Sequence, residues 1–137
     1  MKVLVVEDEP LTAFVLKDEL ENAGHEVIGP VAELGDALLL ARRHRPDLAL
    51  LEIELEGGFA GLDLARELTR LDIPCVYATA QSTLARANSG CAIGYLAKPF
   101  NPTGLAEIVR AIEQVVAGKF PTALLVPPSL EFFGRLS

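Results

Sequence analysis

Short aliphatic runs alternate with amphipathic stretches five times along this chain of 137 residues. Runs of this length, rich in Val, Leu and Ile, are typical of buried strands, and the stretches between them have the apolar spacing of helices. The predicted strands are 3–6, 26–29, 48–53, 74–78 and 93–97. Because parallel strands need crossover connections, five such units predict an α/β domain with a doubly wound, five-stranded parallel sheet and five helices.

Proline and glycine mark the ends of the predicted helices. The first helix begins near Pro10 and runs through Leu11 and Phe14 toward Gly24, a typical C-terminal stop. The last, over 102–117, carries a broad apolar stripe. The second helix ends before Pro46, and the third carries Leu62, Ala65, Leu68 and Leu71 at helical spacing. The fourth, over 82–90, is small and polar, so we expect a short or mobile element.

Charge and hydropathy exclude several classes of function. The net charge of -7 is unfavourable for nucleic acid and for anionic membranes, so we expect neither as a partner. No apolar run approaches the roughly 18 residues that a bilayer crossing needs, and the start does not look like a signal peptide. The expected location is cytoplasmic. Cys75 and Cys91 have no histidine at ligand spacing, which predicts two reduced thiols.

Chemically active residues follow four of the predicted strands. Acids come after the first and third, at Glu7, Asp8 and Glu52, while Thr79 and Lys98 follow the fourth and fifth. Each alone is more often a solvated loop residue. Strand ends of a doubly wound sheet nevertheless meet at one edge, where ligands bind. Clustered carboxylates there need a divalent cation or the Lys98 ammonium, and without metal at least one of the three should have a raised pKa.

Four motifs at these positions are similar to those of the response-regulator receiver domain of two-component signalling. They are VLVVEDEPL, PDLALLEIELEGGFAGLDLA, YATA and GYLAKPF, in the family's order and spacing over residues 2 to 117. The resemblance implies a sheet in the order 2-1-3-4-5. It also implies a signalling module rather than an enzyme. We therefore expect a receiver domain over 1–118, followed by an apolar, proline-containing arm over 119–137 that lies beyond the resemblance.

The resemblance implies a magnesium site formed by acids. The pair matching Glu7 and Asp8 helps to hold Mg²⁺ in the family, and Glu52 occupies the place of the aspartate that accepts a phosphoryl group. The residue matching Glu54 offers its backbone carbonyl to the metal. Mg²⁺ binding is therefore expected at these four residues, weakened by the glutamate at position 52.

Three further residues match the family's switch. The Thr79 match hydrogen-bonds a phosphoryl oxygen, the Lys98 match contacts the phosphoryl group, and the Tyr95 match is an aromatic that swings inward on activation. Lys98-Pro99 resembles the family's cis peptide. The implied partners are proteins: a histidine kinase, a phosphotransfer protein or a downstream target.

Glutamate at position 52 departs from the family pattern. Its carboxylate lies about 1.5 Å further out than that of aspartate, and misplacement of this order can cost about 100-fold when several groups must meet. Phosphoryl transfer should therefore be impaired. Two alternatives remain open: Glu52 imitates the phosphorylated state through Thr79 and Lys98, or it forms an ion pair with Lys98 in a static docking scaffold. A laboratory replacement of aspartate is a third origin for this residue.

The region after Gly118 extends beyond the resemblance and is too short for an output domain. It is too apolar for a solvated linker, and its prolines favour an extended arm packed on its own domain or on a second copy. A disordered end is the alternative. We expect protein-protein output by a stand-alone regulator, with a possible homodimer through the fourth helix, fifth strand, fifth helix and the arm.

An enzyme of related fold is the rival interpretation. Magnesium-dependent phosphatases of the haloacid-dehalogenase type also open on a strand that ends in acids, but they need a second aspartate two residues after the first. Asp8 is followed at that spacing by Pro10. No glycine-rich element with a GK[ST] sequence occurs, which excludes a P-loop nucleotide binder.

Overall fold

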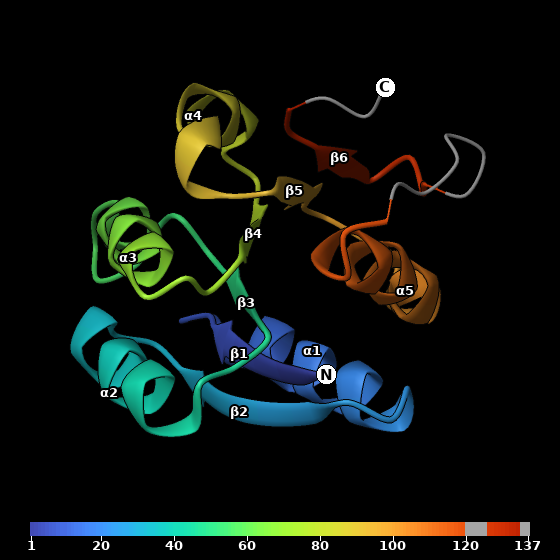
Figure 1. Ribbon diagram of the computed structural model, residues 1–137, viewed down its shortest axis with the longest axis horizontal. Helices are drawn as coiled ribbons and strands as arrows, with labels where there is room; N and C mark the ends of the chain where they lie inside the picture. The colour runs from blue at the N-terminus through green and yellow to red at the C-terminus, as the bar shows by residue number, and fades with distance from the viewer. Residues whose placement is uncertain (120–125, 135–137) are drawn as a thin grey trace.

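A computed structural model describes residues 1–119 and 126–134 of the chain. Helices and strands alternate as the sequence predicts, and each βα unit contributes one strand to a single sheet (Figure 1). The elements are β1 (Lys2–Val6), α1 (Pro10–Asn22), β2 (Glu26–Val31), α2 (Leu34–His44), β3 (Leu48–Leu51), α3 (Ala60–Arg70), β4 (Cys75–Thr79), α4 (Ser82–Ala87), a 3₁₀ turn (Ser89–Cys91), β5 (Gly94–Ala97), a 3₁₀ turn (Pro102–Gly104), α5 (Leu105–Val116) and β6 (Leu130–Phe132).

The sheet has the order β2-β1-β3-β4-β5-β6. Its first five strands are parallel in the predicted order 2-1-3-4-5, which confirms the doubly wound α/β fold. The sheet also has a sixth strand that the sequence did not predict, because Leu130–Phe132 pairs antiparallel with the outer edge of β5. Three residues within a proline-containing tail carry too little alternation to be recognised as a strand.

Two helical layers bury the sheet between them. Figure 1 shows α1 and α5 on one face, and α2, α3 and α4 on the other. Leu16 and Leu20 of α1 pack in one apolar cluster with Ile108 and Ile112 of α5, whereas Leu64 of α3 packs in the opposite one. β1, β3 and β4 are buried on both faces, which explains their continuous apolar sequences.

Two helices differ from a simple apolar pattern. The buried residues of α1 include Leu16 and Leu20, while Leu11 and Phe14 are 69% and 63% exposed. The fourth helix is short, as predicted, and ends at Ala87 before a 3₁₀ turn. Within the described ranges, no helix has the length and apolar character needed to traverse a bilayer.

Gly61 fixes the contact between α3 and the end of β3. A Cβ at this position would overlap the carbonyl oxygen of Glu52 and would lie 2.6 Å from the Ile53 Cα. Its amide also donates to the Ile53 carbonyl at 3.0 Å. The missing side chain therefore allows the helix to begin directly against the backbone that carries Glu52.

We predict that Gly61→Ala destabilises the fold by about 1–3 kcal/mol, because backbone atoms cannot move away from a new methyl group as a flexible side chain can. Gly35→Ala is the matched control: it also lies in the first turn of a helix, with nothing within 4 Å of the added Cβ, and should stabilise by about 0.5–1 kcal/mol. Urea unfolding of both variants measures the difference. Equal midpoints would contradict the close contact.

Candidate functional site

Four strand ends bring together the polar residues that the sequence singles out. Glu7 follows β1, Glu52 follows β3, Thr79 ends β4, and Lys98 follows β5. Ladder-like hydrogen bonds continue into these residues: the Glu52 amide donates to Val6 O at 2.9 Å, and the Lys98 amide donates to Thr79 O at 3.0 Å. The backbone of the sheet thus positions the side chains along one edge.

The Lys98 ammonium lies between two carboxylates. Its Nζ donates to Glu7 Oε1, and lies 3.0 Å from Glu52 Oε1. Glu7 and Glu52 are only 4% and 8% exposed, and the Lys98 side chain is 18% exposed. The peptide bond between Lys98 and Pro99 is cis. Two buried acids from β1 and β3 therefore share one cation from β5.

Backbone amides bind the second oxygen of Glu52. Glu52 Oε2 accepts from the amide of Ile53 at 2.6 Å and from the amide of Glu54 at 3.3 Å. The side chain thus folds back over the backbone that follows it. Both carboxylate oxygens of Glu52 are engaged, one by an ammonium and one by amides, and charge-assisted bonds of this kind are stronger than neutral ones.

Burial and ion pairing shift the pKa of each of these groups in opposite directions. Burial raises the pKa of Glu7 above its usual value, and the bonds from Lys98 and from the Glu9 amide only partly offset it. For Lys98, burial alone would lower the pKa, but the hydrogen bonds to Glu7 and Glu52 outweigh it and the pKa is raised. The prediction that one of the three acids has a raised pKa is confirmed at Glu7.

Thr79 and Tyr95 have local partners of their own. Thr79 is fully buried, and its Oγ1 accepts from the Gln81 amide at 3.0 Å, at the turn into α4. The ring of Tyr95 stacks on that of Phe133, with centroids 5.9 Å apart. Their switch functions stay predictions. The contact with Phe133 had no sequence signal, because the two residues belong to different segments of the chain.

The predicted magnesium ligands do not come together as a cation site. Glu7 and Glu52 are bound to Lys98, whereas Asp8 and Glu54 are exposed. Across residues 1–119 and 126–134, no group of three His, Cys, Asp or Glu side chains is placed to hold a metal ion. An ammonium already occupies the space between the buried acids, so the donor set does not fit Mg²⁺ in this arrangement. A metal-binding function for the four acids stays a prediction.

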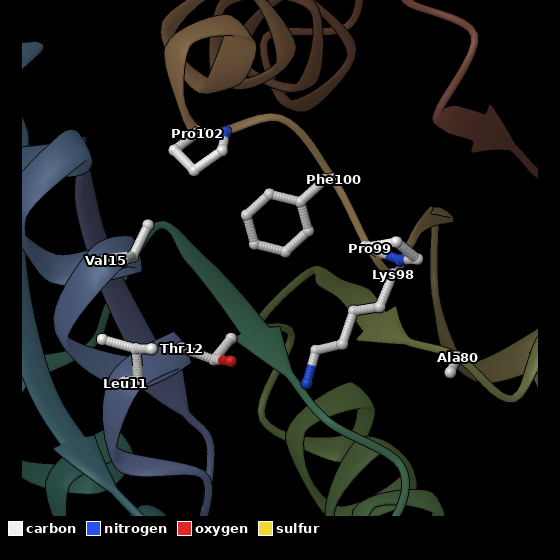
Figure 2. A pocket seen from close by; sticks show the side chains of 8 residues that line it. All are labelled: Leu11, Thr12, Val15, Ala80, Lys98, Pro99, Phe100 and Pro102. Carbon is white, nitrogen blue, oxygen red and sulfur yellow. The ribbon is translucent and has the colours of Figure 1, made fainter.

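An apolar groove adjoins the site. It has a volume of about 350 Å³ and lies between α1 and the segment that follows β5 (Figure 2). Leu11, Thr12 and Val15 form one wall, and Lys98 and Phe100 belong to the opposite wall. The remaining lining residues are Ala80, Pro99 and Pro102. Leu11, which lines the groove from α1, is an exposed apolar residue outside the buried stripe of the helix, and the sequence had not marked it as part of a binding surface.

Comparison with known proteins identifies the family. The family model for the response regulator receiver domain matches residues 3–110, well over half of the chain. The chain belongs to this family. It is a receiver domain, a signalling module rather than a classical enzyme, in line with the motifs at the strand ends.

Relatives of known sequence or structure agree with this assignment. The transcriptional regulatory protein PdtaR of Mycobacterium tuberculosis is 33% identical over 120 residues, which are 85% of this chain and 57% of that protein. The chain thus spans little more than half the length of this curated relative. The signal receiver domain of a modulated diguanylate cyclase from Desulfovibrio desulfuricans G20 has a TM-score of 0.73 and 34% identity, over 85% of this chain and 94% of that one.

A third relative of known structure was crystallised with a bound ligand. The response regulator TrrA of Thermotoga maritima, in complex with Mg(2+)-BeF, has a TM-score of 0.69 and 33% identity, over 81% of this chain and 97% of that one. All three comparisons concern the same α/β unit.

We predict that Lys98→Met lowers the free energy of unfolding by about 3 kcal/mol at pH 8, because two buried carboxylates lose their counter-charge. In this variant the raised pKa of Glu7 should rise further. A carboxyl with a raised folded-state pKa is protonated first in the folded chain, so the loss should shrink as the pH falls through that pKa toward the ordinary 4.5.

Urea unfolding between pH 5 and pH 8 measures this effect. Lys17→Met is the matched control, since Lys17 pairs with Glu21 in an exposed bridge at 2.9 Å and should contribute less than about 1 kcal/mol. A loss in Lys98→Met that did not change with pH would contradict the shared-cation arrangement.

Proposed function

We propose that this receiver domain works without phosphoryl transfer, as a protein-docking module whose Glu52 holds the switch site in one fixed state. The observation that carries the proposal is the engagement of both Glu52 oxygens, by Lys98 on one side and by the Ile53 and Glu54 amides on the other. A group held in this way keeps its charge satisfied within the protein.

An acceptor carboxylate must present a free oxygen in line with the incoming phosphorus. Glu52 would first have to break its bond to Lys98 or to the amides, and its longer side chain would then place the product away from the other groups. Lys98 would also have to leave Glu7 or Glu52 to neutralise the phosphoryl oxygens. Both requirements raise the barrier. We therefore infer that Glu52 is a structural substitute for an acceptor.

The alternative of phosphoryl mimicry has less support. Mimicry would require Glu52 to engage Thr79, as a phosphoryl oxygen is expected to do. Among the described residues, the hydrogen-bond partners of the Glu52 carboxylate are Lys98, Ile53 and Glu54, and the Thr79 hydroxyl accepts from Gln81. One shared ion pair contributes less than the roughly 5 kcal/mol that is needed to shift a two-state equilibrium from mostly inactive to mostly active. A fixed scaffold is the interpretation that these contacts favour.

The ion pairs of Lys98 with the buried acids also bear on Mg²⁺ binding. TrrA of Thermotoga maritima is described in complex with Mg(2+)-BeF, whereas the buried acids in this chain already have an ammonium between them. Bringing a divalent cation next to Lys98 costs repulsion. We propose that Mg²⁺ binds weakly and is not needed for docking.

Proteins are the proposed partners, and the net charge of -7 is unfavourable for nucleic acid. Downstream targets fit a fixed scaffold better than a histidine kinase or a phosphotransfer protein, because nothing needs to be transferred. A homodimer through the fourth helix, fifth strand and fifth helix meets an obstacle: β6 of the same chain already covers the edge of β5. That mode of association needs the segment to move.

We predict that incubation with Mg²⁺ and a small phosphodonor leaves the mass of the protein unchanged. Glu52→Asp should gain the mass of one phosphoryl group, because the shorter side chain restores the geometry that Thr79 and Lys98 complement. Intact-mass spectrometry after rapid quenching measures both, with Glu52→Gln as the control that lacks a carboxylate. A stable mass gain on the unmodified chain, absent from Glu52→Gln, would overturn the proposal.

We also predict that Lys98→Met binds Mg²⁺ at least about tenfold more tightly than the unmodified chain, equivalent to about 1.4 kcal/mol. Removing the ammonium leaves two buried carboxylates that need a positive charge, and oxygen ligands suit Mg²⁺. Isothermal titration calorimetry with MgCl₂ measures the affinity, and Lys17→Met is again the control. Tight binding by the unmodified chain, unaffected by Lys98→Met, would place the metal elsewhere.

A further inference from the structure

The outer edge of β5 is covered by a short segment of the same chain. β6 pairs with β5 in antiparallel register over three residue pairs: Gly94↔Phe132, Tyr95↔Glu131 and Leu96↔Leu130. Hydrogen bonds extend the ladder at both ends, with the Ala97 amide donating to Ser129 O and the Phe133 amide to Ile93 O, each at 2.8 Å. The backbone of β5 thus binds five consecutive residues, 129–133, in extended form.

Side chains beside β5 recognise the chemistry of this segment. Arg86 of α4 donates to both carboxylate oxygens of Glu131, from Nε at 3.2 Å and from Nη2 at 3.0 Å. The same guanidinium lies 5.5 Å from the centre of the Tyr95 ring, on which Phe133 stacks at an interplanar angle of 22°. Arg86 therefore recognises the acid of the segment, and Tyr95 recognises its aromatic residue.

The apolar residues of the segment face the core. Leu130 and Phe132 are buried in the cluster formed with α1 and α5, while Glu131 points to the side of Arg86. Alternation of this kind is what specific recognition of an added strand requires: main-chain bonds hold the segment, and alternate side chains enter pockets.

Gly94 shapes the edge for a neighbouring strand. A Cβ at this position would lie 2.5 Å from the Glu131 carbonyl oxygen and 3.2 Å from the Phe132 Cα. Its backbone does not have a positive φ, so the small residue is needed for the close approach rather than for conformation. The edge of β5 is built to accept a strand at this point.

We propose that the edge of β5, together with Arg86 and Tyr95, is a binding site for an extended segment of a protein partner, and that residues 129–133 are its displaceable internal ligand. The partner segment would add antiparallel to β5. It would carry an apolar residue, an Asp or Glu, a second apolar residue and an aromatic, in that order.

The resident segment can be displaced because it is short and its ion pair is exposed. Arg86 and Glu131 have side-chain exposures of 58% and 43%, so their bridge is weak. A partner that also contacts a neighbouring surface can compete with it. Exchange between two copies of this chain only replaces each contact by an identical one, so it gains nothing to offset the cost of association. A different protein can offset that cost with contacts beyond the edge of β5, and it is the favoured occupant.

A peptide with the sequence of residues 127–134 is the probe, titrated by fluorescence anisotropy against the full chain. The variant Glu131→Ala/Phe133→Ala weakens the resident segment and should bind the peptide at least about tenfold more tightly than the unmodified chain. Adding Arg86→Glu should reverse this gain, and a Glu131→Lys version of the peptide should restore it. Glu67→Ala, which removes an exposed acid paired with Arg70, is the control and should bind as the unmodified chain does.

Three results would overturn the proposal. One is a peptide affinity that is the same for the double variant and the unmodified chain, or that does not change when Arg86→Glu is added. A second is a stable dimer of the double variant or of the unmodified chain in analytical ultracentrifugation, whose dissociation by the peptide would make a second copy the occupant. The third comes from hydrogen exchange. We expect the amides of Ala97 and Phe133 to exchange before the amides of β1 and β3. If they exchange only when the whole protein unfolds, the segment is not displaceable.

None of these measurements involves Glu52 or the phosphodonor. The inference can therefore fail while the proposed function stands, and the reverse also holds.

Discussion

One ammonium between two buried carboxylates is the constraint on which this site depends. Moving a single carboxylate from water into a protein interior costs several kcal/mol, and two adjacent acids add their repulsion. The parallel sheet forces Glu7 and Glu52 together, because β1 and β3 are neighbours whose ends share one edge. Lys98 arrives from the end of β5, two strands away from β3, and its long side chain reaches both acids. The sheet order thus places two buried acids side by side and also brings the lysine that neutralises them.

The extra methylene of Glu52 changes which groups bind its carboxylate. Its carboxylate reaches Lys98 with one oxygen and folds back onto the Ile53 and Glu54 amides with the other. Gly61 helps to keep this backbone in place by allowing α3 to pack directly against it. These contacts are internal, so the charge of Glu52 is neutralised by groups of the protein itself. A domain whose electrostatics are complete in this way is suited to present a constant surface.

The sequence predicted the parts of this structure that depend on local pattern. Aliphatic runs and their spacing were enough for the five parallel strands and for the meeting of Glu7, Glu52 and Lys98 at one edge. The directions of Asp8 and Glu54 were not predictable, because each lies in a loop where strand alternation has ended. The pairing of Arg86 with Glu131, 45 residues apart, has no local signal either. The strand Leu130–Phe132 was missed for the same reason: its partner edge, rather than its own sequence, makes it a strand.

β5 joins the two sites of this molecule. Its outer edge binds residues 129–133, and the residue directly after it is Lys98. An uncovered edge strand invites pairing with other chains, so a resident segment both protects the sheet and defines which sequences can replace it. Lys98 restrains the same strand from its end, through bonds to two other strands' acids. A partner that replaced β6 would therefore dock on a strand whose position is already set by the buried ion pairs, and rigid edges bind extended segments with the smallest cost in ordering.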